Sequence, residues 1–385
     1  MRLKIFSDQQ YLLKSDTVRP HPMLLPFWSH FTETGDEPWI NQHERYREIA
    51  HTLFEMVPLE EADFAVMPDD WRTVTGELWY SQVNQQAQEL YLQFAQRAEA
   101  AGKPLIVFFG CDRSDDEVPS LKNAFIFRHS CYRSQKKPHH FVWPSFCEDF
   151  VQRYFENQLP IRQKQEKPTV GFCGLTKRDS WKFNLKRIAY YLYILPQGKI
   201  RTTHPPFEGH ILRNKVIEIL KNSDLVKTNF ITYDRMVFLG KKSLDQRKQS
   251  RDEYIQNMRS SDYVVCCRGT ANFSNRLFET LCCGRIPILI DTDCSLPYDF
   301  IIDWKKYCVW IDEKEITNIG QKVAEFHNNL SPQEFVDLQL ECRRFWQEWL
   351  STEGFFSKFH LHFKSVLIAE GRGQRAESGR EKIDR

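Results

Sequence analysis

Short apolar runs alternate along the chain with longer segments in which apolar residues recur every three or four positions. A short apolar run is typical of a buried strand, and the longer spacing is typical of a helix with one buried face. The predicted strands are residues 2–6, 62–67, 105–109, 124–127, 169–174, 263–267, 286–290 and 307–311. The predicted helices are residues 43–55, 80–101, 210–220, 250–259, 313–329 and 331–350. This alternation predicts an α/β fold in which helices cover both faces of mostly parallel sheets.

Composition divides the chain into two domains and a C-terminal extension. A chain of 385 residues is long enough for two domains of ordinary size. The segment between Pro160 and Pro168 carries mostly charged and amide side chains, which is typical of a linker. The predicted parts are an N-terminal domain at 1–160, a linker at 161–168, a C-terminal domain at 169–330, C-terminal helices at 331–369 and a disordered tail at 370–385. The tail is assigned by its lack of apolar residues to bury.

Charge and cysteine content narrow the class of protein. The formal net charge is only +2, which gives little support for nucleic-acid binding. Eleven cysteines include two adjacent pairs but no C-x-x-C spacing, so we expect buried thiols in a reducing compartment and no metal or other cofactor. The first residues lack an apolar run of signal-peptide length, and no stretch approaches the roughly 20 apolar residues that span a bilayer. We therefore expect a cytoplasmic protein, with a possible site of action at the inner membrane face.

The segment 261–303 carries the clearest chemistry. A buried strand runs directly into Arg268 and Gly269, and a small polar loop leads from there into a short helix. Ligands of open α/β sheets bind at the carboxyl ends of strands, and helix N-termini bind anions. Arg268 and Arg276 offer guanidinium groups for phosphate oxygens, and Glu279 can accept hydrogen bonds from two ribose hydroxyls. These residues predict a site for a nucleoside diphosphate, although Arg276 and Glu279 are also spaced for an ordinary surface ion pair.

A longer ordered pattern favours the nucleotide site. It comprises Arg-Gly, Ser-x-Arg-x-x-Glu, Gly-x-Ile-Pro followed by an apolar strand, and Leu-Pro-x-Asp. The pattern resembles the exostosin family of glycosyltransferases, whose members adopt the GT-B architecture: two Rossmann-like domains with parallel sheets facing across a cleft, and a C-terminal helix that returns to the N-terminal domain. The strands at 62–67 and 124–127 match the family more loosely. The resemblance implies that the nucleotide-sugar donor is bound by Arg268, Gly269, Ser274, Arg276 and Glu279, with Arg213 as a further contact.

The resemblance also implies an inverting transfer from a UDP- or GDP-sugar to a hydroxyl of an oligosaccharide or lipid-linked glycan, in surface polysaccharide synthesis and with possible peripheral membrane association. Such a reaction needs a base on the N-terminal domain. Carboxylates or imidazoles at strand ends are candidates, namely Asp8, Asp69, Asp70, Asp112 and His129. We favour Asp70, because its loop should face the cleft and Trp71 could stack on a sugar; Asp8 and His129 are the alternatives. A structural turn is the competing role for Asp70.

Two other interpretations stay open at this point. Asp291 and Asp293 form a D-x-D after an apolar strand, which is also typical of metal-dependent GT-A glycosyltransferases. The chain could instead be a catalytically silent glycosyltransferase-like module that binds a glycan. Two weaker signals lie early in the C-terminal domain: a possible phosphate turn at Gly171 and Gly174, and a basic cluster more typical of a solvated face than of donor binding. The cluster consists of Lys177, Arg178, Lys182 and Lys186.

Overall fold

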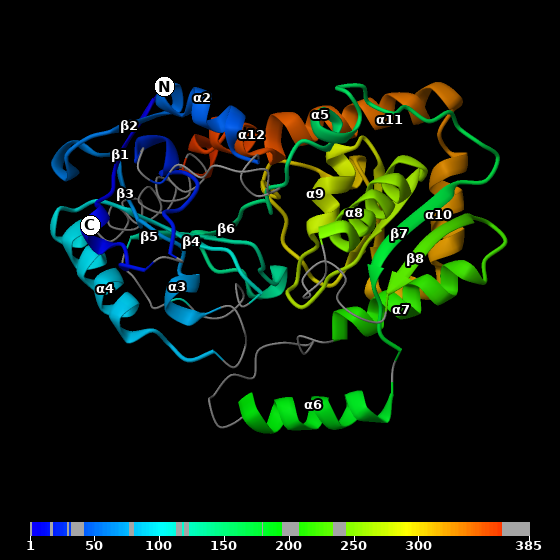
Figure 1. Cartoon of the computed structure of the whole chain (residues 1–385), viewed down its shortest axis with the longest axis horizontal. Helices are drawn as coiled ribbons and strands as arrows, with labels where there is room; N and C mark the ends of the chain where they lie inside the picture. The colour runs from blue at the N-terminus through cyan, green and yellow to red at the C-terminus, as the bar shows by residue number, and fades with distance from the viewer. Residues whose placement is uncertain are drawn as a thin grey trace, which may run out of the picture.

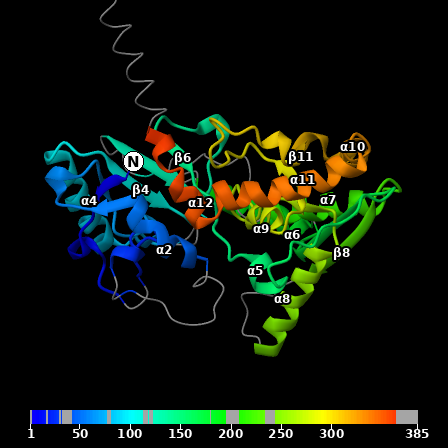
Figure 2. The same cartoon turned by 90° about the horizontal axis from the view of Figure 1, so that it is seen from above.

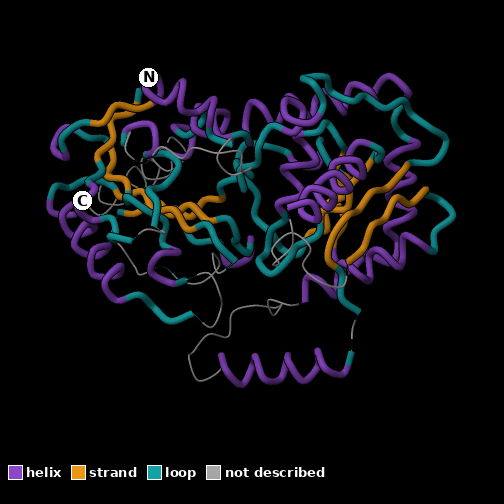
Figure 3. The backbone as a smooth tube through the Cα atoms, in the orientation of Figure 1, coloured by secondary structure: helices purple, strands orange, loops and turns teal. Residues whose placement is uncertain are grey.

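The computed structural model has two lobes joined side by side (Figure 1). It describes residues 2–15, 18–28, 31, 42–76, 81–112, 118, 123–178, 180–194, 208–233 and 244–363. Within these residues the strands form two sheets, one in each lobe (Figure 3). All neighbouring strands in both sheets run parallel. The predicted α/β class is therefore confirmed.

The N-terminal lobe contains a six-stranded sheet with the order β2-β1-β3-β4-β5-β6 among the described residues. Its strands are β1 (Leu3–Phe6), β2 (Phe54–Met56), β3 (Phe64–Val66), β4 (Leu105–Phe109), β5 (Ala124–Arg128) and β6 (His140–Val142). Its helices are α2 (Glu44–Leu53), α3 (Arg72–Thr75) and α4 (Gln85–Ala100). The central strands β4 and β5 are buried along their whole length, which explains why their apolar runs were recognisable in the sequence.

The C-terminal lobe contains a five-stranded sheet with the order β11-β10-β9-β7-β8 in the described part of the chain. Its strands are β7 (Thr169–Leu175), β8 (Lys227–Tyr233), β9 (Tyr263–Cys266), β10 (Ile286–Asp291) and β11 (Val309–Asp312). The helices that follow or precede them are α5 (Phe150–Tyr154), α6 (Trp181–Ile194), α7 (Glu208–Lys221), α8 (Leu244–Arg259), α9 (Asn275–Cys282) and α10 (Ile319–Asn328). The segment β9-α9-β10 is the βαβ unit that the sequence predicted.

The C-terminal helices return from the second lobe to the first. Helix α11 (Pro332–Phe345) begins with a capping box between Ser331 and Glu334, continues as a π-helical turn, and is followed by α12 (Thr352–Ser357). Figure 2 shows α11 on the C-terminal lobe and α12 beside α2 of the N-terminal lobe. There the ring of Phe356 packs 4.6 Å from that of Tyr46. This crossover and the two facing sheets form the GT-B architecture expected from the sequence.

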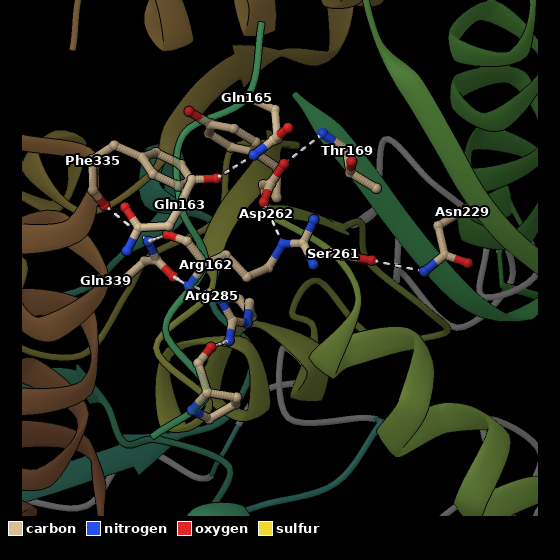
Figure 4. Close-up of polar contacts among 12 residues, drawn as sticks. Arg162, Gln163, Gln165, Thr169, Asn229, Ser261, Asp262, Arg285, Phe335 and Gln339 are labelled. Atoms are coloured by element: carbon tan, nitrogen blue, oxygen red, sulfur yellow. Dashed lines mark hydrogen bonds and ion pairs between the residues drawn. The ribbon is translucent and has the colours of Figure 1, made fainter. Parts of the chain in front are cut away.

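The segment 161–168, predicted as a linker by its composition, is fixed to the C-terminal lobe and is not a free tether (Figure 4). The guanidinium of Arg162 pairs with Asp262, whose side chain is fully buried. The amide of Gln339 accepts from the backbone N–H of Arg162 at 2.9 Å and donates to its carbonyl at 2.8 Å. Buried Arg285 donates to Gln339 at 2.7 Å and to the carbonyl of Pro160. The polar side chains of this segment thus serve attachment as well as solubility.

Several elements differ from the sequence predictions. Strands β2, β6 and β8 were not predicted: β2 and β6 have only three residues each, and the sequence of β8, KTNFITY, reads as largely polar. Gly171 and Gly174 lie inside β7 and form no phosphate turn. All eleven cysteines are free thiols. The predicted disordered tail at 370–385 lies outside the described residues. Among the helices described, none is both long enough and apolar enough to cross a bilayer.

Candidate functional site

A cavity of about 370 Å³ opens beside the loop between β9 and α9. It lies at the carboxyl ends of β7 and β9, where α/β sheets bind ligands. Its lining includes five of the six residues that the sequence analysis assigned to the donor: Arg213, Gly269, Ser274, Arg276 and Glu279. We call it the candidate donor cavity.

The N-terminus of α9 faces this cavity with its first turn open. Ser274 is the N-cap residue, but its side chain makes no capping hydrogen bond to the first turn. The backbone N–H groups at the start of a helix favour a bound anion, and they favour it most when no side chain occupies them. Gly209, at the start of α7, lets that helix approach the loop, since a Cβ there would lie 2.0 Å from the Gly269 carbonyl oxygen. The close approach brings Arg213 to the cavity.

Three arginines line the donor cavity, from three different helices. Arg276 donates to the carbonyl of Cys173 at 2.6 Å, while its buried Nε and Nη1 have no hydrogen-bond partner within the described structure. A side chain at Gly174 would displace this guanidinium, because a Cβ there would lie 2.7 Å from Nη2. Burial and the neighbouring charge of Arg276 lower the pKa of Arg213 to about 10. Close positive groups with unused donors are suited to an anionic ligand.

Glu279 has a different partner from the one that its spacing suggested. Its carboxylate accepts a hydrogen bond from the hydroxyl of Tyr254 on α8. Burial alone would lower the pKa of Arg251, but the carboxylates of Glu279 and Glu148 together with Tyr154 raise it. Arg251 and Tyr254 both line the cavity, and the sequence analysis missed both. They lie on one face of α8, and their spacing of three was the only signal available.

Arg268 occupies a different position from the other donor candidates. Its Nη1 donates to the Tyr132 hydroxyl of the N-terminal lobe at 2.8 Å, and its Nη2 donates to the carbonyl of Thr270 at 3.1 Å. The side chain is buried, and it is not part of the donor-cavity lining in this structure. Arg268 therefore contributes to contact between the lobes, and its predicted phosphate contact stays a prediction.

A second and larger cavity, of about 810 Å³, lies in the N-terminal lobe. Asp70, Gly110, His129 and Trp143 are among the residues that line it. A Cβ at Gly110 would lie 3.0 Å from Asp70, 3.0 Å from His129 and 2.6 Å from Trp143, so these three side chains converge on one point. The expected sugar-stacking role of Trp71 is wrong for this structure, because Trp71 is buried in the core against Tyr91. Trp143, packed flat on His129, and Phe146 are aromatic rings that line this cavity.

Burial shifts the pKa values of Asp70 and His129 in opposite directions. One carboxylate oxygen of Asp70 accepts from the N–H of Arg72 at 2.8 Å and the other from the N–H of Gly110 at 2.8 Å. Burial raises the pKa of Asp70 to about 6, against the opposing effects of Arg72 and those hydrogen bonds. Burial lowers the pKa of His129 to about 3. A general base is most effective when its pKa is near the working pH, so Asp70 is better suited than His129.

The remaining base candidates are placed elsewhere or serve other contacts. Asp8 caps a short 3₁₀ turn through the N–H of Gln10 and pairs with Arg97 at 2.9 Å, outside the lining of both cavities. Asp69 is buried, and burial raises its pKa to about 7. Asp112 lines the donor cavity, to which it brings a carboxylate from the N-terminal lobe.

The two cavities lie next to each other across the lobes. His129 lines the larger cavity and Phe273 the donor cavity, and their rings are 5.3 Å apart. Gly110 and Asp112, two residues apart on the loop after β4, belong to one cavity each. A ligand in the donor cavity would therefore have its reacting end close to Asp70 and His129.

Asp291 and Asp293 bind the N-terminal lobe. Asp291 accepts from Arg133 at 2.9 Å and from the indole N–H of Trp310 at 3.2 Å, and Asp293 accepts from the backbone N–H and hydroxyl of Ser134. The described residues contain no group of three or more His, Cys, Asp or Glu side chains that could hold a metal ion. The GT-A interpretation is wrong for the fold, because the chain has two parallel-sheet lobes and these carboxylates lie in the contact between them.

The sequence of the C-terminal lobe is similar to that of known proteins. Residues 202–326 match the family model described as the Exostosin GT47 domain, a segment that includes Arg213, Arg251, Arg276 and Glu279. This part of the chain is therefore similar to the exostosin GT47 domain. Exostosin-1 of Drosophila melanogaster is 22% identical over 201 residues, which cover 51% of this chain and 25% of that protein. A "Probable beta-1,4-xylosyltransferase" of Arabidopsis thaliana is 35% identical over 63 residues, covering 16% of this chain and 15% of the relative.

The match covers only part of each relative, and the chain spans a quarter or less of the length of these curated relatives. Among solved structures, a "Glycosyltransferase from Rickettsia africae ESF-5" is similar with a TM-score of 0.35 and 12% identity, covering 87% of this chain and 83% of that one. The donor-cavity residues of the C-terminal lobe lie inside the segment 202–326 that matches the Exostosin GT47 domain, whereas Asp70 and His129 lie outside it.

Proposed function

We propose that this protein is a glycosyltransferase that moves a sugar from a nucleoside-diphosphate donor to a hydroxyl group of a glycan. The observation that carries the proposal is the donor cavity inside the segment that matches the Exostosin GT47 domain, where Arg213, Arg251 and Arg276 surround the open N-terminus of α9. Cationic groups and free N–H donors stabilise the negative charge that builds up on a departing diphosphate. Glu279 lies on the same lining and offers an acceptor for ribose hydroxyls.

Asp70 is the proposed base of an inverting transfer. It lies in the adjoining cavity of the other lobe, and its raised pKa of about 6 leaves the carboxylate largely ionised near neutral pH yet still able to take a proton. In a single displacement, the acceptor oxygen attacks the anomeric carbon as Asp70 removes its proton. The bond between that carbon and the diphosphate oxygen breaks on the opposite side, and the diphosphate leaves with its electron pair into the donor cavity.

The finer assignments stay predictions of the same proposal. The donor is a UDP- or GDP-sugar, the acceptor an oligosaccharide or lipid-linked glycan, and the pathway surface polysaccharide synthesis. Arginines and helix N–H groups supply the positive charge that a metal ion supplies in other enzymes, so we expect transfer to need no divalent ion.

Titration calorimetry with UDP, GDP and uridine tests the donor site. A ligand at a hundredfold excess over its Kd should also raise the stability by about 2.7 kcal/mol. Arg276→Ala should weaken the diphosphates about tenfold or more and uridine much less, because the change removes charge–phosphate hydrogen bonds. Arg344→Ala, an exposed arginine paired with Glu341 on α11, is the matched control and should bind as the wild type does.

Two results would count against the proposal. Failure of every nucleoside diphosphate to bind would remove the donor site. Nucleotide binding without transfer of sugar to any one of the glycan acceptors tested would favour the catalytically silent module.

A further inference from the structure

Helix α6 presents a stripe of apolar side chains to solvent. Trp181, Leu185, Ile188 and Leu192 are spaced by four, three and four residues, which places them on one face of the helix. Their exposed fractions are 67%, 54%, 57% and 66%. Tyr190, on the opposite face, is only 8% exposed. In a globular protein the apolar stripe of a surface helix normally faces the core, so α6 has the reverse orientation.

The helix lies apart from both sheets, below the two lobes in the view of Figure 1. One contact that ties it to the body is the ion pair between Arg187 and Glu208, at 2.5 Å, which joins it to the start of α7. In chain order α6 comes between β7 and α7. The donor cavity lies at the carboxyl end of β7, and α7 supplies Arg213 to its lining, so α6 belongs to the part of the chain that builds this edge of the sheet.

The same segment holds a concentration of positive charge. Residues 177–201 contain seven lysines and arginines and one aspartate, a net charge of +6, whereas the whole chain has a net charge of +2. Within α6, Lys182 and Lys186 lie one turn apart beside the apolar stripe, and the helix contains no acidic residue. The solvated-face interpretation of this basic cluster explains the lysines but leaves the exposed tryptophan and leucines unexplained.

An apolar face with tryptophan, flanked by basic side chains, is the composition of helices that lie in the interface of an anionic bilayer. Pairing with a second copy of the chain is less suitable, because it would bring two segments of charge +6 together. We propose that α6 docks the protein on an anionic phospholipid surface. The apolar stripe enters the headgroup region, and Lys182 and Lys186 remain at the level of the lipid phosphates.

This docking would hold the donor-cavity edge of the C-terminal lobe against the membrane. If the proposed glycosyl transfer is correct, the acceptor class that fits this position is a lipid-linked glycan, whose hydroxyl lies just above the bilayer. The docking itself does not depend on that function, and vesicle binding measures it without any donor or acceptor.

The test is flotation of the full chain with vesicles of phosphatidylcholine alone or of phosphatidylcholine with phosphatidylglycerol. We expect binding to the mixed vesicles, weakened by salt. Leu185→Glu should lower the partition coefficient about tenfold or more, because it removes a leucine that would be buried in the bilayer and adds a charge of the same sign as the lipid. Lys182→Gln should lower it about fivefold. Leu340→Glu, at an exposed leucine of α11, is the matched control and should bind as the wild type does.

UDP binding by Leu185→Glu shows whether that variant is folded, and it should equal the wild-type value. Equal binding of the wild type to both kinds of vesicle, or no loss of binding in Leu185→Glu, would overturn the proposal. The wild type could instead fail to bind vesicles and form a dimer in light scattering that Leu185→Glu dissociates. That result would assign the stripe to contact with a second copy of the chain. A protein that binds vesicles but no nucleotide would retain the docking and lose the proposed function.

Discussion

Replacing Asp70 by Asn separates a catalytic role from a structural one, because the two roles predict opposite changes in stability. The side chain keeps its size, loses its charge and can no longer accept a proton. If Asp70 is the base, transfer should fall by about a hundredfold to ten-thousandfold while UDP or GDP binding is unchanged. If Asp70 serves only as a turn residue, the variant should lose stability, and its activity should follow the folded fraction.

The magnitude follows from the burial of the carboxyl group. Its pKa rises from 3.8 to about 6 on folding, chiefly because burial disfavours the charge. The folded state therefore holds the proton more tightly, and this contribution to stability is fully present below pH 3.8 and is lost as the pH rises through about 6. A difference of this size corresponds to about 3 kcal/mol. The amide that replaces the carboxyl group does not titrate, so the variant avoids this loss.

At pH 3 the variant should be roughly 1 kcal/mol less stable than the wild type. The reason is that an amide oxygen can replace only one of the two accepting oxygens that bind the N–H groups of Arg72 and Gly110. At pH 7 it should be about 2 kcal/mol more stable, since the wild type has lost about 3 kcal/mol. Urea unfolding at both pH values measures the difference between the two proteins, in which the contribution of buried Asp69 largely cancels. A variant that is less stable at pH 7 and retains activity per folded molecule would refute the reasoning and leave His129 as the alternative base in this cavity.

Three further predictions concern the donor cavity and the contact between the lobes. Glu279→Ala should weaken the binding of UDP or GDP about tenfold or more by calorimetry. Tyr254→Phe, which removes only the hydrogen bond to that carboxylate, should weaken nucleotide binding less. Equal losses in the two variants would mean that Glu279 acts through Tyr254. Arg268→Ala should weaken diphosphate binding less than Arg276→Ala does, because Arg268 binds Tyr132 across the lobes. A loss larger than that of Arg276→Ala would place Arg268 on the phosphates. Asp293 has a positive φ of 61°, which Asn also tolerates. Asp293→Asn should therefore keep initial rates within a few-fold of the wild type, with or without EDTA. Activity that EDTA abolishes and manganese restores would contradict the metal-free transfer.

The parts of the fold that were predictable are those buried on both sides. The predicted runs within β4, β5, β9 and β10 are apolar because helices cover both faces of each sheet. These strands could therefore be located from the sequence alone. β8 has exposed or half-buried residues throughout, and no apolar run marked it.

The same distinction applies to the candidate site. Arg276, Ser274 and Glu279 lie on one short segment, so their order in the sequence was enough to group them. Arg251 and Tyr254 reach the cavity from a distant helix, and the polar pairing of Arg268 with Tyr132 joins two lobes. Such relations arise only from tertiary packing, which no local pattern records.

The fixed attachment of residues 161–168 determines where the chain can act as a hinge. The attachment of the C-terminal body begins before this segment, because Asp149 pairs with Arg343 at 2.6 Å and the N–H of Phe150 donates to Cys282 at 3.3 Å. The first crossing between the lobes therefore bends between β6 and Asp149, and the second bends near the start of α12. The ring of Phe146 on the first crossing lies 5.9 Å from that of Phe355 on the second, so the two crossings lie side by side. Any rotation of one lobe against the other would have to bend the chain at these two crossings and break the ion pair of Arg133 with Asp291.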